Sequence, residues 1–203
     1  MTVQSHAREV QTTIQGRLGT ITLNRPQALN ALNLAMVEQL DAIALLWRIE
    51  MAGTAMDGQW PSIADHVASR ATETFMPFMN AHYIYALARA GRRDAVEAGL
   101  ASVRARSMAN DEEAQRVWAA AGRPIVEAAA AFGAGDRARA AALLDPVMSM
   151  MTSIGGSDAQ DDLFRQSYLR SLQAAGRHAD ATAFSARITA GKLRTPLDRA
   201  LAS

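Results

Sequence analysis

The sequence predicts an all-α fold, a solenoid of antiparallel helix pairs, preceded by a short β-hairpin. Alanine dominates from Ala81 onward, whereas Val, Ile and Thr are sparse there. Alanine is the best helix former because it loses no side-chain entropy on folding. Glycines that could end helices recur at comparable intervals along this region, and β-branched runs stand near the N-terminus.

The hairpin is predicted from two short runs, Val10–Ile14 and Thr20–Leu23, separated by the sequence QGRLG. Glycines in that connection can supply the positive φ that tight turns need. A two-stranded hairpin is marginally stable alone in water, so it should need a further partner.

A long helix is predicted after Asn24-Arg25-Pro26, because proline is favoured in the first turn of a helix. From Leu29 to Gly53 no proline or glycine interrupts the chain. One apolar stripe runs along this segment at steps of three or four residues, formed by Leu32, Met36, Leu40, Ile43 and Trp47.

Three later segments align on Gly91, Gly135 and Gly176, with separations of 44 and 41 residues. Such a spacing fits a pair of antiparallel helices per unit. In each segment the glycine is expected at the helix C-terminus, followed by charged residues and then alanines that allow close helix packing. The array is similar to tetratricopeptide (TPR) repeats, although its spacing exceeds the usual length of those repeats.

Composition narrows the possible functions. The 203 residues carry a net charge of +1 and contain no cysteine. A nucleic acid or a membrane surface is therefore not expected as partner, since both require clustered cationic side chains. Disulfides, thiolate metal sites and cysteine nucleophiles are excluded. No apolar run approaches the length of a membrane span, and a soluble cytoplasmic protein is expected.

The stretch GRLGTITLNRPQALNALNLAMVEQLDAI, Gly16–Ile43, resembles the N-terminus of the crotonase family, the enoyl-CoA hydratases and isomerases. That resemblance implies ββα units and acyl-CoA chemistry on backbone N–H groups of two later loops, to which no later segment here is similar. The matching residues form a strand-to-helix connection whose backbone neighbourhood helps seat CoA in the family: Asn24, Arg25, Pro26, Asn30 and Ala31.

A second resemblance covers about Leu45–Ile188. The stretches LLWRIEMAGTAMDGQW, NAHYIYALARAGR and IGGSDAQDDLF look like the C-terminal half of the tetratricopeptide repeat protein 38-like family, an all-helical repeat family without an established chemical activity. Asp158 stands where that family usually has histidine, and Asp161 where it usually has arginine. A ligand role that depends on that histidine or that arginine is therefore not implied for this chain.

These resemblances meet between about residues 39 and 47, inside the predicted long helix. We therefore expect a fusion with a tail and crotonase-like hairpin at 1–26, a helical repeat domain at 27–189 and a C-terminal tail at 190–203. The hairpin and long helix could cap the open end of the array, or two chains could cap one another.

The loop Gly155-Gly156-Ser157 before a helix is one candidate ligand site, because free N–H groups at a helix start attract anions. The alternative, which the pattern favours, is a capping box between Ser157 and Gln160. Asp158, with Asp161 and Asp162, would repel an anion there, and the helical spacing of these carboxylates does not suit a metal.

His82 and Tyr85 are weak candidates for the same binding surface, although a histidine in an apolar helix is more often a packing residue. Trp47, Trp60 and Trp118 are expected in the core. No catalytic residue, cofactor or metal site is predicted.

The expected function is a non-catalytic module for protein interaction or self-association, with a peptide, a protein or a second copy as partner and a homodimer as the expected oligomer. The alternative is crotonase-like acyl-CoA binding or enoyl-CoA hydratase or isomerase activity, which would need elements from another chain.

Overall fold

The computed structural model describes residues 10–15, 18–23, 42–155 and 158–190. By their internal contacts the residues divide into two compact units, Met1–Leu46 and Trp47–Ser203, and each is described by itself. The first half of the predicted long helix, residues 29–41, and the predicted segment Asn24–Ala31 lie outside the described residues.

In the first unit, strand β1 (Val10–Gln15) pairs antiparallel with strand β2 (Leu18–Leu23). Val10 lies opposite Leu23 and Gln15 opposite Leu18. Each strand is longer than the β-branched run in the sequence, because pairing continues up to the residues that flank the connection.

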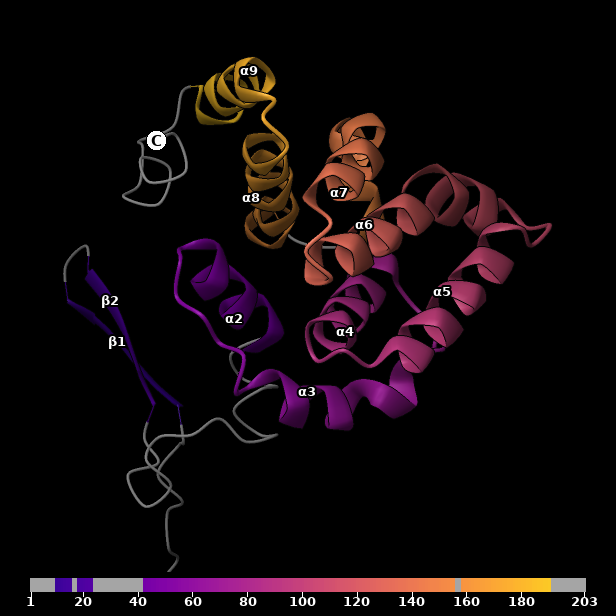
Figure 1. Cartoon of the computed structure of the whole chain (residues 1–203), viewed down its shortest axis with the longest axis horizontal. Helices are drawn as coiled ribbons and strands as arrows, with labels where there is room; N and C mark the ends of the chain where they lie inside the picture. Colours follow the sequence, from indigo (N-terminus) through magenta and orange to yellow (C-terminus); the bar gives the residue numbers. More distant parts are fainter. Residues whose placement is uncertain (1–9, 16–17, 24–41, 156–157, 191–203) are drawn as a thin grey trace, which may run out of the picture. The chain divides into compact units, whose positions relative to one another are not determined.

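The described residues from 42 to 190 form helices and turns (Figure 1). In chain order these are α2 (Ala42–Met51), α3 (Trp60–Val67), η2 (Ala68–Arg70), α4 (Pro77–Arg89), α5 (Arg93–Ser107), η3 (Ala114–Gly122), α6 (Arg123–Gly133), α7 (Arg137–Leu144), η4 (Asp145–Ile154), α8 (Asp158–Ala174) and α9 (His178–Thr189). The all-α prediction for this region is confirmed.

The predicted glycine turns are confirmed. Gly91, Gly135 and Gly176 have φ of 70°, 87° and 73°, the left-handed region that favours glycine. At each turn the glycine N–H bonds a carbonyl three residues back, and the next N–H bonds one five residues back, which is the Schellman pattern. A fourth turn of this kind, at Gly53 after α2, was not predicted.

Helix α4 is the centre of the packing, with contacts to α3, α5, η3 and most extensively α6. Gly133 allows the close approach of α6, since a Cβ there would lie 2.9 Å from the Ala88 Cβ and 3.0 Å from the Tyr85 carbonyl oxygen. Farther along the chain, α6 packs on α7, α7 on α8 and α8 on α9. Between α4 and α6, small residues thus allow the close approach that the sequence predicts.

A π-helical segment, η3, leads without a break into α6. Pro124 would clash with the carbonyl four residues back in a regular α-helix, and it cannot donate a backbone hydrogen bond. The wider π turn relieves this conflict, and the Arg123 N–H bonds the Trp118 carbonyl five residues back. The sequence analysis did not predict this change of helix type.

An aromatic cluster fills the core. The rings of Trp47 and Tyr85 stack with centroids 3.7 Å apart and planes 2° from parallel. Phe132 and Phe164 surround the Trp47 indole with tilted and edge-on contacts. The prediction that Trp47, Trp60 and Trp118 lie in the core is confirmed, since each is at most 1% exposed.

Candidate functional site

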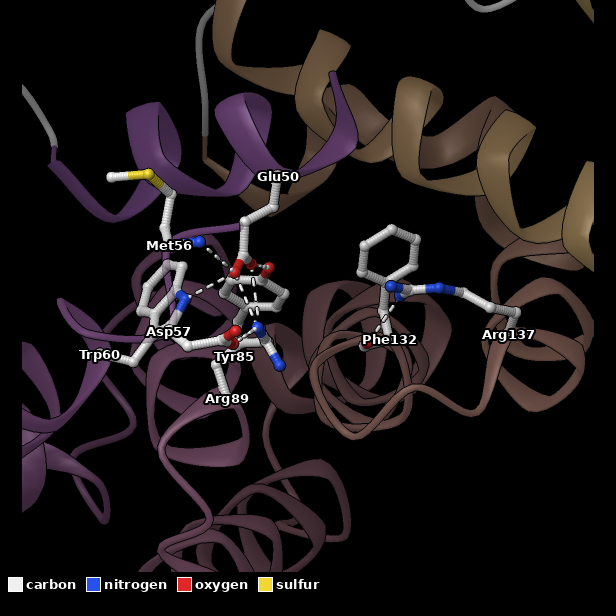
Figure 2. A network of polar contacts seen from close by, with 8 residues as sticks. All are labelled: Glu50, Met56, Asp57, Trp60, Tyr85, Arg89, Phe132 and Arg137. Atoms are coloured by element: carbon white, nitrogen blue, oxygen red, sulfur yellow. Dashed lines mark hydrogen bonds and ion pairs between the residues drawn. The ribbon is translucent and has the colours of Figure 1, made fainter. Parts of the chain in front are cut away.

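A polar network around Glu50 joins the ends of three helices (Figure 2). Glu50 lies in the last turn of α2, Trp60 begins α3, and Tyr85 and Arg89 are one turn apart on α4. One carboxylate oxygen accepts from Trp60 Nε1 at 2.9 Å and Arg89 Nη2 at 2.7 Å. The other accepts from the Tyr85 hydroxyl at 2.8 Å and Arg89 Nε at 3.0 Å.

The network extends toward solvent through Asp57. Arg89 Nη2 lies 2.6 Å from Asp57 Oδ1, and the Met56 N–H donates to Glu50 at 3.4 Å. The Asp57 side chain is 75% exposed, whereas that of Glu50 is 13% exposed. The inner ion pair is therefore the one shielded from water.

Burial and hydrogen bonding act in opposite directions on the ionisation of Glu50. Burial alone would raise its pKa, but the hydrogen bonds from Arg89, Trp60 and Tyr85 favour the charged form and together hold the pKa below its usual value. The pKa of the Tyr85 hydroxyl is raised by burial and by the neighbouring Glu50 charge. Glu50 is thus a carboxylate at neutral pH, and Tyr85 is a neutral donor.

This arrangement leaves Glu50 little capacity for proton transfer. Both carboxylate oxygens already accept two side-chain hydrogen bonds each from residues of the protein. The network therefore acts as a clamp that fixes the α2, α3 and α4 ends.

A cleft of about 360 Å³ borders this clamp on one side. Glu50 and Tyr85 form part of its wall. The other lining residues come from α2, the turn after it, α6, α7 and α8: Met51, Gly53, Phe132, Arg137, Arg170, Gln173 and Ala174. The Arg137 guanidinium lies over the Phe132 ring, 3.5 Å from its centroid, and Nη1 donates to the Phe132 carbonyl at 2.5 Å (Figure 2).

A separate groove of about 420 Å³ lies where α4, α5, α6 and α7 meet. Its apolar wall includes Val96 and Leu100 together with alanines of α4 and α6. Both signs of charge line it: Arg92, Arg93, Arg104 and Arg139 against Glu97, Glu127 and Asp136. The groove shares no lining residue with the cleft.

The predicted site residues do not gather at one surface within the described part of the chain. Tyr85 is buried and bound to Glu50. His82 is 2% exposed, and its Nδ1 lies 2.8 Å from the Phe78 carbonyl oxygen. Its ring packs edge-on against Phe164, the arrangement expected of a packing histidine.

The GGS loop is described only in part. Gly155 has φ of 89°, where a Cβ would meet the Met76 sulfur, and Gln160 is half-buried. Gly156 and Ser157 lie outside the described residues, as does the Asp158 side chain, so the predicted anion site and capping box remain predictions. Asp161 is fully buried, whereas Asp162 accepts from Gln166 at 2.6 Å.

The five residues of the crotonase-like connection, Asn24, Arg25, Pro26, Asn30 and Ala31, also lie outside the described residues. In the described ranges, no three histidine or acidic side chains come together in a way that could hold a metal ion. None of the helices in those ranges combines the length and apolar character needed to cross a bilayer.

Sequence reasoning missed the clamp and the cleft. Glu50 and Arg89 are 39 residues apart, and no local pattern links them. The only available signal was the spacing of Tyr85 and Arg89, which places both on one face of α4.

Comparison with known proteins finds similarity over a short stretch of the chain. No family model matches the chain, and no solved structure does. A stretch of 28 residues, 14% of the chain, is 71% identical to a probable enoyl-CoA hydratase of Rhizobium meliloti (strain 1021). The match spans 11% of that protein, and it supports a crotonase-like fragment in this chain.

Proposed function

We propose that the helical region is a non-catalytic helical-repeat module that binds a protein or peptide segment in the α4–α7 groove. The observation that carries this proposal is the groove itself, which is lined both by apolar side chains and by charged side chains of both signs. Interaction surfaces commonly have this composition, an apolar centre within a polar rim.

The repeated glycine turns support the repeat part of the proposal. Each of Gly91, Gly135 and Gly176 ends one helix of a pair and leads within two residues into the next. The sequence analysis expected such repeats from the resemblance of Leu45–Ile188 to a TPR-like family, although no family model matches the chain. Stacked helix pairs leave grooves between them, and these are the surfaces through which repeat proteins bind partners.

The groove favours an apolar segment flanked by charges. Val96 and Leu100 lie one turn apart on α5 and present an apolar strip to such a segment. The arginines and acidic residues beside them can pair with charges of either sign on the partner. A second copy of the chain and an unrelated peptide both meet this description.

Self-association is tested first by light scattering over a wide protein concentration range. A second copy in the groove predicts a mass that rises toward twice the monomer, and Leu100→Asp should keep the protein monomeric. Met108→Asp is the matched control, because Met108 is 79% exposed and lies outside the groove. Circular dichroism must show equal helix content in all three proteins.

If the wild-type protein is monomeric throughout, the peptide form of the proposal is tested with a displayed peptide library. Selected peptides should contain apolar residues flanked by charge, and they should lose binding to Leu100→Asp but not to Met108→Asp. Selection of no peptides, or of peptides that bind both variants equally, would contradict the groove as the binding site.

The match to a probable enoyl-CoA hydratase favours a second candidate, acyl-CoA binding or crotonase-like activity with elements from another chain. A ligand that binds only the native state raises its stability. Crotonyl-CoA at sub-millimolar concentration should then raise the melting temperature of the protein. Crotonate, which lacks the CoA group, should not. An unchanged melting temperature would remove this candidate.

A further inference from the structure

We propose that the cleft between the Glu50 clamp and α8 binds a small organic carboxylate through Arg137 and Arg170. This site is distinct from the α4–α7 groove and does not depend on the function proposed for it. The inference rests on two half-buried guanidinium groups that line one cleft without a carboxylate partner.

Neither arginine forms an ion pair with an acidic residue of the described ranges. Arg137 bonds the Phe132 carbonyl, and Arg170 Nη1 makes a long contact of 3.4 Å with Gln173 Oε1. The Arg170 Nε is shielded from solvent and has no acceptor among the described residues. Since a guanidinium carries five N–H donors, most of the donors of both groups are uncommitted.

Glu50, the acidic residue that lines this cleft, forms no ion pair with either arginine and acts on Arg137 only through its charge. Its carboxylate is fully engaged by Trp60, Tyr85 and Arg89. Burial lowers the pKa of Arg137, where the Glu50 charge opposes it only in part, and burial alone lowers the pKa of Arg170. A bound anion would compensate the charge of both groups.

The remaining walls indicate which anion fits. Met51, Phe132 and Ala174 give the cleft an apolar side next to the two arginines. Inorganic phosphate would leave this surface uncovered, whereas a carboxylate on a short apolar chain would cover it. The volume of about 360 Å³ is within the range of small-ligand pockets.

The geometry of the arginine side chain also favours a carboxylate as the ligand. Arginine presents parallel N–H groups that match the two oxygens of a carboxylate. The Arg137 guanidinium is held in place from one face by the Phe132 ring, so little side-chain freedom is lost when a ligand binds.

The test uses the full chain labelled with ¹⁵N and titrated with hexanoate, while the arginine Nε–H signals are followed by NMR. Saturable shifts of the Arg137 and Arg170 signals are expected. Hexanamide has the same shape without the charge and should bind at least about tenfold more weakly, since charge-assisted hydrogen bonds are the stronger kind. Equal binding of hexanamide, or no saturable shift with hexanoate, overturns the proposal.

Variants locate the site. Arg137→Gln and Arg170→Gln should each weaken hexanoate binding about tenfold or more. Arg139→Gln is the matched control, because Arg139 is exposed on the same helix as Arg137 and lines the groove instead. Loss of binding in Arg139→Gln, or retention in both other variants with unchanged melting temperatures, contradicts the assignment.

Two further binding experiments distinguish a carboxylate at a peptide C-terminus from that of a free organic acid. A short apolar peptide with a free C-terminus, compared with its C-terminal amide, tests a peptide source, and hexanoate tests a free acid. Binding in either experiment that requires the carboxylate supports the site. Inorganic phosphate that binds as tightly as hexanoate shows a general anion site and overturns the carboxylate assignment.

Discussion

Glu50 is the residue on which the α2, α3 and α4 ends depend. It is largely shielded from water, and it compensates the charge of Arg89 while accepting from an indole and a phenol. Removal of one partner of a shielded ion pair leaves the other charge and its hydrogen-bond donors without compensation.

We expect Glu50→Gln to lower the free energy of unfolding by about 2–3 kcal/mol, because the amide cannot pair with Arg89 or accept all the hydrogen bonds. Urea unfolding followed by circular dichroism measures the change. Asp57→Asn is the control for the same arginine, and its exposed ion pair should contribute less than about 1 kcal/mol. Equal effects of the two substitutions would contradict the clamp.

The lowered pKa of Glu50 predicts a pH dependence of stability. In the unfolded chain the pKa of a glutamate is about 4.3, and the pKa of Glu50 in the folded protein is below its ordinary value. The clamp therefore stabilises the protein fully above the unfolded pKa, and this contribution is lost as the pH falls through the folded pKa. The difference in unfolding free energy between wild type and Glu50→Gln should shrink between pH 6 and pH 3. A difference that is constant over this range is the contrary result.

At the scale of elements, glycine acts in two different ways. At Gly91, Gly135 and Gly176 the need is conformational, since φ is positive while a Cβ would meet nothing within 4 Å. At Gly133 the need is spatial, because α4 lies directly against the backbone.

Alanine substitutions should separate these two roles. Gly176→Ala should cost about 1–2 kcal/mol through the left-handed backbone alone. Gly133→Ala should cost more, because its Cβ would overlap both the Ala88 Cβ and a backbone carbonyl. Gly58→Ala is the control, with ordinary φ and open space. Thermal unfolding of the three variants gives the order, and a Gly133 variant as stable as the Gly58 variant would rule out the close approach.

The elements also show how far sequence reasoning reaches. Helix ends at Gly91, Gly135 and Gly176 could be predicted because a cap is a local chemical requirement. The buried tryptophans could be predicted from their place in apolar stripes. The Glu50–Arg89 pair and the Arg137–Arg170 cleft could not, because each joins residues more than thirty positions apart and the sequence carries no mark of that proximity.

A local conflict can also be hidden in the sequence. Pro124 would ordinarily be taken as a helix boundary, yet the chain remains helical on both sides of it through the π turn of η3. The predicted ligand site at Gly155-Gly156-Ser157 is a different case. Gly156 and Ser157 lie outside the described ranges, so an anion-binding role of this loop remains a prediction.

At the scale of the molecule, the unit Trp47–Ser203 holds an aromatic core of its own, formed by residues of α2, α3, α4, α6 and α8. We expect a shortened chain that begins at Ala42, the first residue of α2, to fold cooperatively. Far-ultraviolet circular dichroism should show a helical spectrum, and thermal unfolding should give a single transition. A spectrum without helix would mean that this unit is not an independent folding unit.

Because all three tryptophans are buried, intrinsic tryptophan fluorescence can be used to follow unfolding. Tryptophans shielded from water emit at shorter wavelengths than hydrated ones. The wavelength of maximum emission should therefore increase when the core unfolds. Trp60 donates to Glu50, and Trp47 stacks on the tyrosine that donates to the same carboxylate. Two of the three tryptophans are therefore coupled to Glu50 through direct or second-neighbour contacts, and we expect protonation of Glu50 to change their fluorescence.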